Sequence, residues 1–358
     1  MKKLVALFLV AISFANAKGQ VAATNDSTGI FIQNKITEAF DENGLPGLLV
    51  AVINNGNSVF YTRGYANPDT KLSFDSATLF EIGSITKTFT AYLLQKILFH
   101  NNIADTTSII QYLPDSVQQN KALQKITFLS LMNHTSGLPR LPNNMELEAG
   151  NKNPYDNYGA GKLFTYLKTC TPAPDGKSNY SNLGMGLAGV MAEMITKKKY
   201  AILLEENIFR PFNMIASTDD FSLDGNKSQG FFDDEKTGYW NMDVLAPAGG
   251  LKCTGKEMMT YLQNMAQPVN EQAGKVISEL LKPTVALNPR VNVCKAWHSF
   301  EQTDKPVIYW HNGGTFGFST FSAFIKGQKK AVMVVINKFN KNQVADGLGI
   351  AIMKLLNK

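Results

Sequence analysis

Ser84 and Lys87 lie three positions apart in residues 80–91 (FEIGSITKTFTA), where an apolar helix is predicted to begin. Side chains at positions i and i+3 share one face of a helix. A serine in this position can accept an acyl group if the lysine is held neutral, because only a free amine can take up the hydroxyl proton. The same pattern also fits a helix start in which Ser84 is the N-cap and Lys87 is solvated.

Two later clusters carry groups that would complete such a site. Tyr180 and Asn182, in the loop triplet YSN, offer a phenol that can relay a proton and an amide that can hold a substrate amide. The segment HNGGTFG begins at His311, directly after the predicted strand VIYW. Its glycines would let a substrate backbone lie close to the strand edge, where a backbone NH can complete an oxyanion hole. Each cluster alone also fits a turn or a hairpin loop, but their order and setting together favour one site.

With these motifs the chain resembles the class C β-lactamase and DD-peptidase family of serine hydrolases, whose motif set includes SxxK and KTG. SITK, YSN and HNG stand here in the places of SxxK, YxN and KTG. The resemblance extends over nearly the whole of residues 18–358, through phrases such as LMNHTSGLP, YSNLGMGLAGVMAEMIT and APAGGLKCTGKEMMTYL.

The resemblance implies a role for each matching residue. Ser84 would be acylated and Lys87 would accept its proton. Tyr180 would protonate the leaving amine and help to activate the deacylating water, and Asn182 would bind the substrate's amide side chain. These assignments make the catalytic set Ser84, Lys87 and Tyr180.

The third motif departs from the family pattern. His311 replaces the lysine of KTG, so an imidazole that is largely neutral near pH 7 stands where a permanent cation binds a drug's carboxylate. His311 and Gly313 would still contact substrate, and the NH groups of Ser84 and Gly314 would form the oxyanion hole. Histidine here is familiar among the family's DD-peptidases and esterases, which lowers the expectation of strong β-lactam hydrolysis.

Three functions therefore stay open. The first is hydrolysis of β-lactams or D-Ala-D-Ala-type peptides through an acyl-enzyme. The second is a carboxylesterase or D-aminopeptidase that uses the same serine, lysine and tyrosine. The third is a slow-turnover penicillin-binding sensor. All three need a small-molecule or peptide substrate and no cofactor.

The predicted fold class is α+β, of the β-lactamase/transpeptidase type. Helical spacing from Ile32 to Phe40 precedes a β-hairpin, LLVAVI–NNGN–SVFYTRGY, and three β-rich runs with a last amphipathic helix occupy the C-terminal part. We expect an antiparallel sheet built from both chain ends (about 28–80 and 291–358), flanked by terminal helices. A largely helical region (about 84–290) would be inserted between them, with a cleft where the two meet.

Residues 1–17 have the form of a cleavable signal peptide: Lys2 and Lys3, a short apolar run, then Ala15-Asn16-Ala17. This predicts a periplasmic or secreted single domain over 18–358. The apolar run is too short to span a membrane, and no later stretch is long enough and free of charge. A dispersed formal net charge of +6 does not indicate nucleic-acid binding. The oligomeric state is not predicted.

Several other features are expected to be structural. Cys170, Cys253 and Cys294 predict buried thiols with at most one disulfide, and the four histidines show no metal-binding spacing. Residues 184–189 match GxGxxG but follow no strand, so helix packing explains them better than a dinucleotide. His134 is expected to be structural, and His100 and His298 have no chemical context. The aromatic residues Phe231, Phe232, Tyr239 and Trp240 fit either a pocket wall or the helical core.

Overall fold

The computed structural model describes residues 27–146, 150, 153–214 and 226–358. The predicted signal peptide, residues 1–17, lies outside the described residues. None of the described helices is long and apolar enough to cross a membrane.

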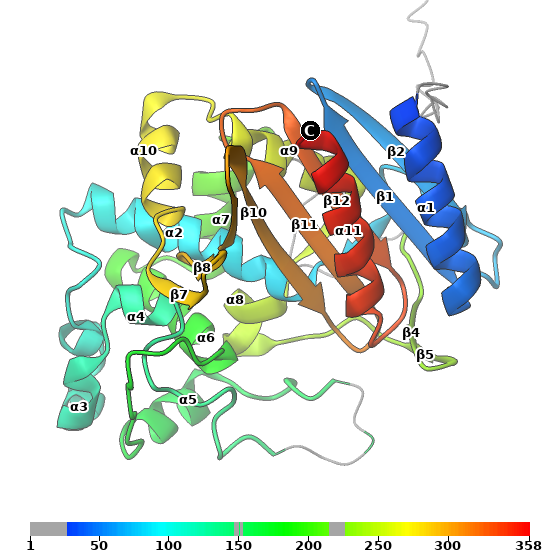
Figure 1. Ribbon diagram of the computed structural model, residues 1–358. Coiled ribbons are helices and arrows are strands. Elements are labelled where there is room, and N and C mark those ends of the chain that lie inside the picture. The colour runs from blue at the N-terminus through cyan, green and yellow to red at the C-terminus, as the bar shows by residue number, and fades with distance from the viewer. Residues whose placement is uncertain (1–26, 147–149, 151–152, 215–225) are drawn as a thin grey trace, which may run out of the picture.

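One antiparallel sheet of eight strands forms the framework, and its central strands come from the two ends of the chain (Figure 1). Strand β1 pairs with β12 in the register Leu48↔Ile336 to Asn54↔Lys330. In sheet order the strands are β2 (Asn57–Gly64), β1 (Gly47–Asn54), β12 (Lys330–Ile336), β11 (Ser319–Ile325), β10 (Lys305–Gly314), β9 (His298–Gln302), β8 (Val291–Val293) and β7 (Val285–Asn288). The predicted assembly of the sheet from both termini is confirmed.

The hairpin between β1 and β2 has the predicted turn, because Asn55 and Gly56 both have positive φ (52° and 86°). Two consecutive positive φ values are the requirement of a type I′ turn, which Asn-Gly adopts at low cost. The C-terminal sheet region was expected to begin near residue 291, but it begins earlier, with β7 at residue 285. The reason is that β7 and β8 form a further hairpin, which extends the sheet edge.

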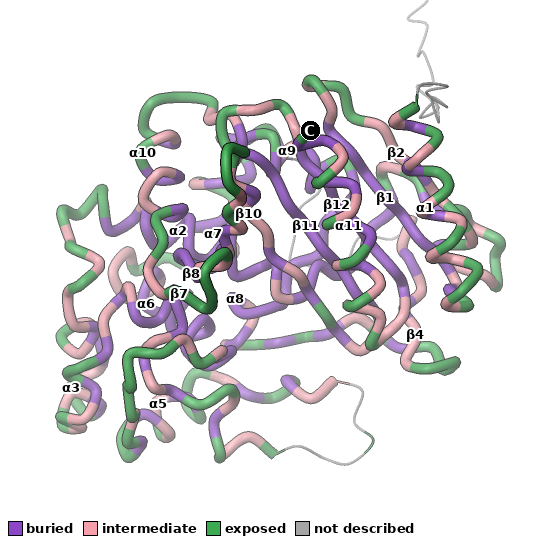
Figure 2. Tube along the Cα trace, in the orientation of Figure 1, coloured by how far each residue is buried: buried purple, intermediate pink, exposed green. Residues whose placement is uncertain are grey.

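Helices cover both faces of the sheet, so its middle strands are almost wholly buried (Figure 2). Alternate residues of β1 point to opposite sides. Leu48, Val50 and Val52 join a cluster with α1 (Ser27–Asn43) and α11 (Asn342–Leu356). Leu49 and Ala51 join the larger core on the other side, together with α9 (Gly255–Ala266).

The rest of the larger core belongs to the helical region, at whose centre lies α2 (Thr86–His100), most of it buried. It packs against α6 (Asn182–Thr196) and α8 (Ala246–Gly249). The remaining helices are α3 (Asp115–Gln118), α4 (Phe128–Met132), α5 (Ala160–Leu167), α7 (Tyr200–Leu204) and α10 (Glu271–Leu280). Two small sheets also lie here, β3 (Leu79–Glu81) with β6 (Lys252–Thr254), and β4 (Gly230–Phe232) with β5 (Glu235–Thr237).

Glycines in α6 allow this close packing. A Cβ on Gly186 would lie 2.5 Å from Leu245 Cδ2, and one on Gly189 would lie 2.2 Å from Pro247 Cγ. The GxGxxG match is therefore a helix-packing surface, as the sequence context indicated.

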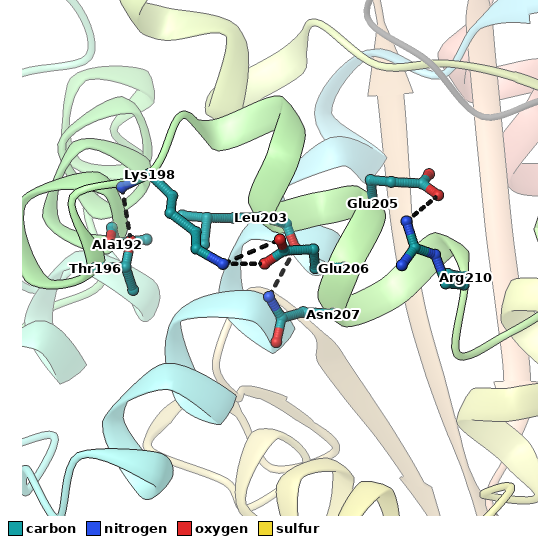
Figure 3. A network of polar contacts seen from close by, with 8 residues as sticks. All are labelled: Ala192, Thr196, Lys198, Leu203, Glu205, Glu206, Asn207 and Arg210. Carbon is teal, nitrogen blue, oxygen red and sulfur yellow. Dashed lines mark hydrogen bonds and ion pairs between the residues drawn. The ribbon is translucent and has the colours of Figure 1, made fainter.

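Helix α6 ends at Lys197, whose φ of 60° breaks the helical path before α7 begins at Tyr200. Figure 3 shows the polar contacts around this break, where the Lys198 ammonium lies 2.7 Å from Glu206 and Arg210 lies 3.5 Å from Glu205. All four side chains are exposed, and exposed ion pairs contribute only about 0–1 kcal/mol each. The three cysteines are buried and form no disulfide with one another.

Candidate active site

Ser84 lies on η1, a single 3-10 turn (Gly83–Ile85) between β3 and α2. Gly83 has φ +53°, and a Cβ there would lie 2.7 Å from the backbone N of Gly314. Only glycine therefore lets η1 approach the end of β10 this closely. The contact places Ser84 in the wall of a cavity of about 570 Å³ between the helical region and β10.

Lys87, in the first turn of α2, is fully buried, and its Nζ lies 3.0 Å from Ser84 Oγ. The same nitrogen donates to the carbonyl oxygen of Ala248 at 2.5 Å. Burial lowers the pKa of Lys87 well below its ordinary value, and the charge of Arg140 lowers it further. An amine held neutral in this way can donate to Ala248 and still offer its lone pair to the Ser84 hydroxyl. Neither η1 nor α2 has a side-chain cap, so the helix-cap interpretation is wrong.

Tyr180, in the loop before α6, lies beside both Ser84 and Lys87. Its ring is 4.7 Å from Lys87 Nζ and 4.6 Å from the ring of His134. Burial raises the pKa of Tyr180, and a hydrogen bond with Ser84 opposes this shift. The phenol therefore stays protonated at neutral pH and can act as a proton donor. His134 accepts from the backbone N of Ser181 at 3.3 Å through Nδ1, and burial lowers its pKa to about 3.

Asn182 begins α6 and lines the cavity. Its Nδ2 donates to the Tyr155 hydroxyl at 3.0 Å. Its Oδ1 is buried and has no hydrogen-bond partner among the described residues. A buried acceptor without a partner is costly, so this oxygen is positioned to receive an N–H group of a substrate.

The end of β10 forms the opposite wall with backbone groups. A Cβ on Gly313 would lie 2.1 Å from the carbonyl oxygen of Ile82, so the strand packs directly on the chain leading into η1. Asn342 of α11, which also lines the cavity, donates to the carbonyl oxygen of Gly313 at 2.6 Å and holds this edge in place. Gly314 packs on Gly83, the residue before Ser84, and both Gly314 and Ser84 line the cavity, so their NH groups can act together.

His311 is placed differently from the other motif residues. Its imidazole is buried and does not line the cavity. Nδ1 lies 2.5 Å from the carbonyl oxygen of Asn312, and Nε2 has no partner in the described part of the chain. Burial lowers the pKa of His311 well below its ordinary value. The ring is therefore a neutral group behind the wall, 5.7 Å from the ring of His298, which sequence reasoning had given no chemical context.

A buried carboxylate supports two parts of the cavity wall. Glu81 of β3 accepts from Thr315 Oγ1 at 2.6 Å and from the backbone N of Trp240 at 2.5 Å. Lys252 of β6 stands opposite Glu81 of β3 in the register of these two strands. Its Nζ donates to the Trp240 carbonyl oxygen at 2.7 Å. Burial raises the pKa of Glu81, and the Lys252 charge counteracts the shift. This pair holds Trp240 and Thr315 in the cavity lining.

The aromatic residues between positions 231 and 240, for which the sequence left open a pocket wall or the core, have different places in the structure. Trp240 lines the cavity, whereas Phe232 packs behind it on Phe316 and Phe339, which also line the cavity. Tyr239 donates to the carbonyl oxygen of Leu79 and belongs to the supporting structure.

Sequence reasoning missed Arg140 and Tyr155, which both line the cavity. Arg140 directly follows the family phrase HTSGLP, so its neighbourhood could have been suspected. Tyr155 has no local signal.

Comparisons with known proteins agree on one family. The β-lactamase family model matches residues 32–357. A β-lactamase of Providencia stuartii is 24% identical over 82% of this chain and 83% of its own length. One of Pseudomonas fluorescens is 31% identical over 49% of this chain and 47% of its own length. A β-lactamase/D-alanine carboxypeptidase structure from Pseudomonas syringae superposes with a TM-score of 0.80 at 21% identity, covering 92% of this chain and 99% of the other. The chain therefore belongs to the β-lactamase family of serine hydrolases.

Proposed function

We propose that the protein hydrolyses β-lactams or D-Ala-D-Ala-type peptides through an acyl-enzyme on Ser84. The observation that carries this proposal is the 3.0 Å contact between Ser84 Oγ and a buried lysine whose pKa is lowered. Among the described residues no carboxylate shifts the pKa of Lys87, and both burial and the Arg140 charge lower it.

Acylation follows from the geometry. Ser84 Oγ attacks the substrate carbonyl carbon while its proton passes to Lys87 Nζ. The developing oxyanion would accept hydrogen bonds from the NH groups of Ser84 and Gly314. Each such donor contributes about 2.7–4 kcal/mol to transition-state stabilisation in other serine hydrolases.

Tyr180 would complete both half-reactions. As the C–N bond breaks, its hydroxyl donates a proton to the leaving nitrogen, and the proton held by Lys87 restores the phenol through the Ser84 position. A water molecule then attacks the acyl carbon while its proton passes, with the help of Tyr180, to the Lys87 amine. The ester C–O bond to Ser84 breaks, the acid leaves, and Lys87 returns the proton to Ser84 Oγ.

The HNG motif, which begins at His311, favours hydrolysis of peptides or esters over fast hydrolysis of β-lactams. The cation that KTG would supply at the strand edge is replaced by a neutral, buried imidazole. This observation also supports the second candidate, a carboxylesterase or D-aminopeptidase with the same three catalytic groups.

Incubation with a fluorescent penicillin, followed by intact mass analysis, tests the proposal. Fast turnover supports a β-lactamase, and a persistent adduct supports a peptidase or a slow-releasing sensor. Ester cleavage without an adduct supports an esterase. Ser84→Ala should abolish both adduct and hydrolysis, and activity that survives this change would refute the assigned nucleophile. Export to the periplasm or medium is proposed from residues 1–17 alone, and appearance of the protein in that fraction would test it.

A further inference from the structure

Arg140 is the one charged side chain among the described residues that line the catalytic cavity. The other described lining residues are neutral: polar, aromatic, apolar or glycine. A cation in this position sets the electrostatic preference of the cavity, because no lining carboxylate opposes it.

The backbone of Arg140 is fixed at the start of α6. Its carbonyl oxygen accepts from the backbone N of Asn182 at 3.0 Å and of Leu183 at 3.2 Å. The loop that carries the arginine therefore cannot move independently of Asn182, the residue proposed to hold the substrate's amide.

The guanidinium lies over the ring of Tyr180, with Cζ 5.2 Å from the ring centroid. Arg140 as a whole is exposed, and its side chain makes no ion pair or hydrogen bond with a described residue. The ring orients the planar group through a cation–π contact and leaves its N–H donors open. Such a fork matches a carboxylate with two parallel hydrogen bonds.

We infer that Arg140 determines specificity by binding a carboxylate on the acyl side chain of the substrate. This inference rests on the proposed acyl-enzyme function. The acyl side is assigned because Arg140 shares its wall with Asn182 and Tyr155, opposite the β10 edge. The preferred substrate class is thus a peptide or lactam whose acyl part ends in an acidic group.

Two thioester substrates with the same leaving thiol test this inference. One carries a glutaryl-glycyl acyl group, which ends in a carboxylate, and the other carries its primary amide. The wild-type protein should prefer the carboxylate in kcat/KM, mainly through KM. Arg140→Gln should reduce that preference by roughly 10- to 100-fold, the usual effect of losing a charge-assisted pair. Arg140→Lys should retain part of it.

Arg290→Gln is the matched control, since Arg290 is exposed and lies outside the cavity. It should leave the substrate ratio as in the wild-type protein. Equal losses on both substrates in Arg140→Gln would overturn the inference, because they would mean that Arg140 acts only through Lys87 and Tyr180.

A binding measurement separates this inference from the proposed function. The affinity of the two thioesters is measured for the Ser84→Ala variant and for the double variant Ser84→Ala/Arg140→Gln. This binding measurement requires no turnover. Selectivity for the carboxylate that disappears with Arg140→Gln supports the inference even if the wild-type protein hydrolyses neither compound. Equal affinities of Ser84→Ala for both compounds overturn it, whatever the hydrolysis assay shows.

Discussion

Two buried lysines lie at helix α2 in different surroundings: Lys87 belongs to the helix, and the amine of Lys295 contacts it. The Lys295 amine lies 2.5 Å from the Asp105 carboxylate and donates to Gln95 of α2 at 2.7 Å. The Lys87 amine contacts a serine hydroxyl and a backbone carbonyl. One end of the helix thus holds a compensated charge, and the other holds an amine that burial drives toward its neutral form.

The difference shows that burial alone does not distinguish a structural lysine from the proposed general base. A carboxylate partner keeps a buried amine charged, which makes it structural. Without such a partner the free base is favoured, at a cost in stability that the surrounding fold must offset. The environment of each amine, and not its position in the core, therefore separates the two roles.

The largest expected effect is on catalysis at Lys87. Lys87→Met should reduce the acylation rate by about 10²- to 10⁴-fold, the usual contribution of a positioned base. Its Tm should equal or exceed that of the wild-type protein, because no buried charge is left unpaired. Stopped-flow acylation and calorimetry measure the two quantities. Acylation within tenfold of wild type would show that another group accepts the Ser84 proton.

The opposite pattern is expected at Lys295. Lys295→Met should lower the free energy of unfolding by about 3 kcal/mol, since it leaves Asp105 without its cation. Acylation per folded molecule should stay close to wild type. Denaturant unfolding measures the loss, and adding Asp105→Asn should recover part of it. A stable Lys295→Met protein would remove the contrast between the two lysines.

The pH dependence of acylation sharpens the assignment of Lys87 as base. A lowered pKa means that the rate should rise with pH through a midpoint well below the ordinary lysine value and then stay constant. Removing the Arg140 charge should raise the pKa of Lys87, so Arg140→Gln should move this limb to higher pH. A limb that does not move in pre-steady-state profiles would contradict the coupling.

The smallest effect concerns Asp346 of α11, a half-buried acid that forms no ion pair with a described residue. Burial raises the pKa of Asp346 to about 6, against the hydrogen bond from Asn312 at 2.8 Å. Above that pH the ionised form costs stability, so Asp346→Asn should raise Tm at pH 8. The advantage should shrink as pH falls below about 6, where the folded carboxyl is protonated. The exposed Asp304→Asn is the control, and equal shifts at both pH values would exclude this cause.

Much of the framework could be predicted from local pattern. The Asn55-Gly56 turn and the apolar runs of β10, β11 and β12 carry their conformation in nearby residues. Arg140 could not be assigned to the cavity, because the position of its loop depends on contacts with the start of α6. The aromatic group was ambiguous for the same reason: Trp240 reaches the wall only because Glu81 and Lys252 hold its backbone.

The sequence by itself determined the chemical groups and their order: a serine and a lysine one helical turn apart, a loop tyrosine, and glycines at a strand end. These depend on residue type and short spacing, which a linear chain displays directly. Only the tertiary structure decided their electrostatic state. It buried Lys87 where no carboxylate of the described residues shifts its pKa, placed His311 behind the wall and left Arg140 exposed. These states depend on desolvation and charge proximity, which arise from segments that are distant in sequence.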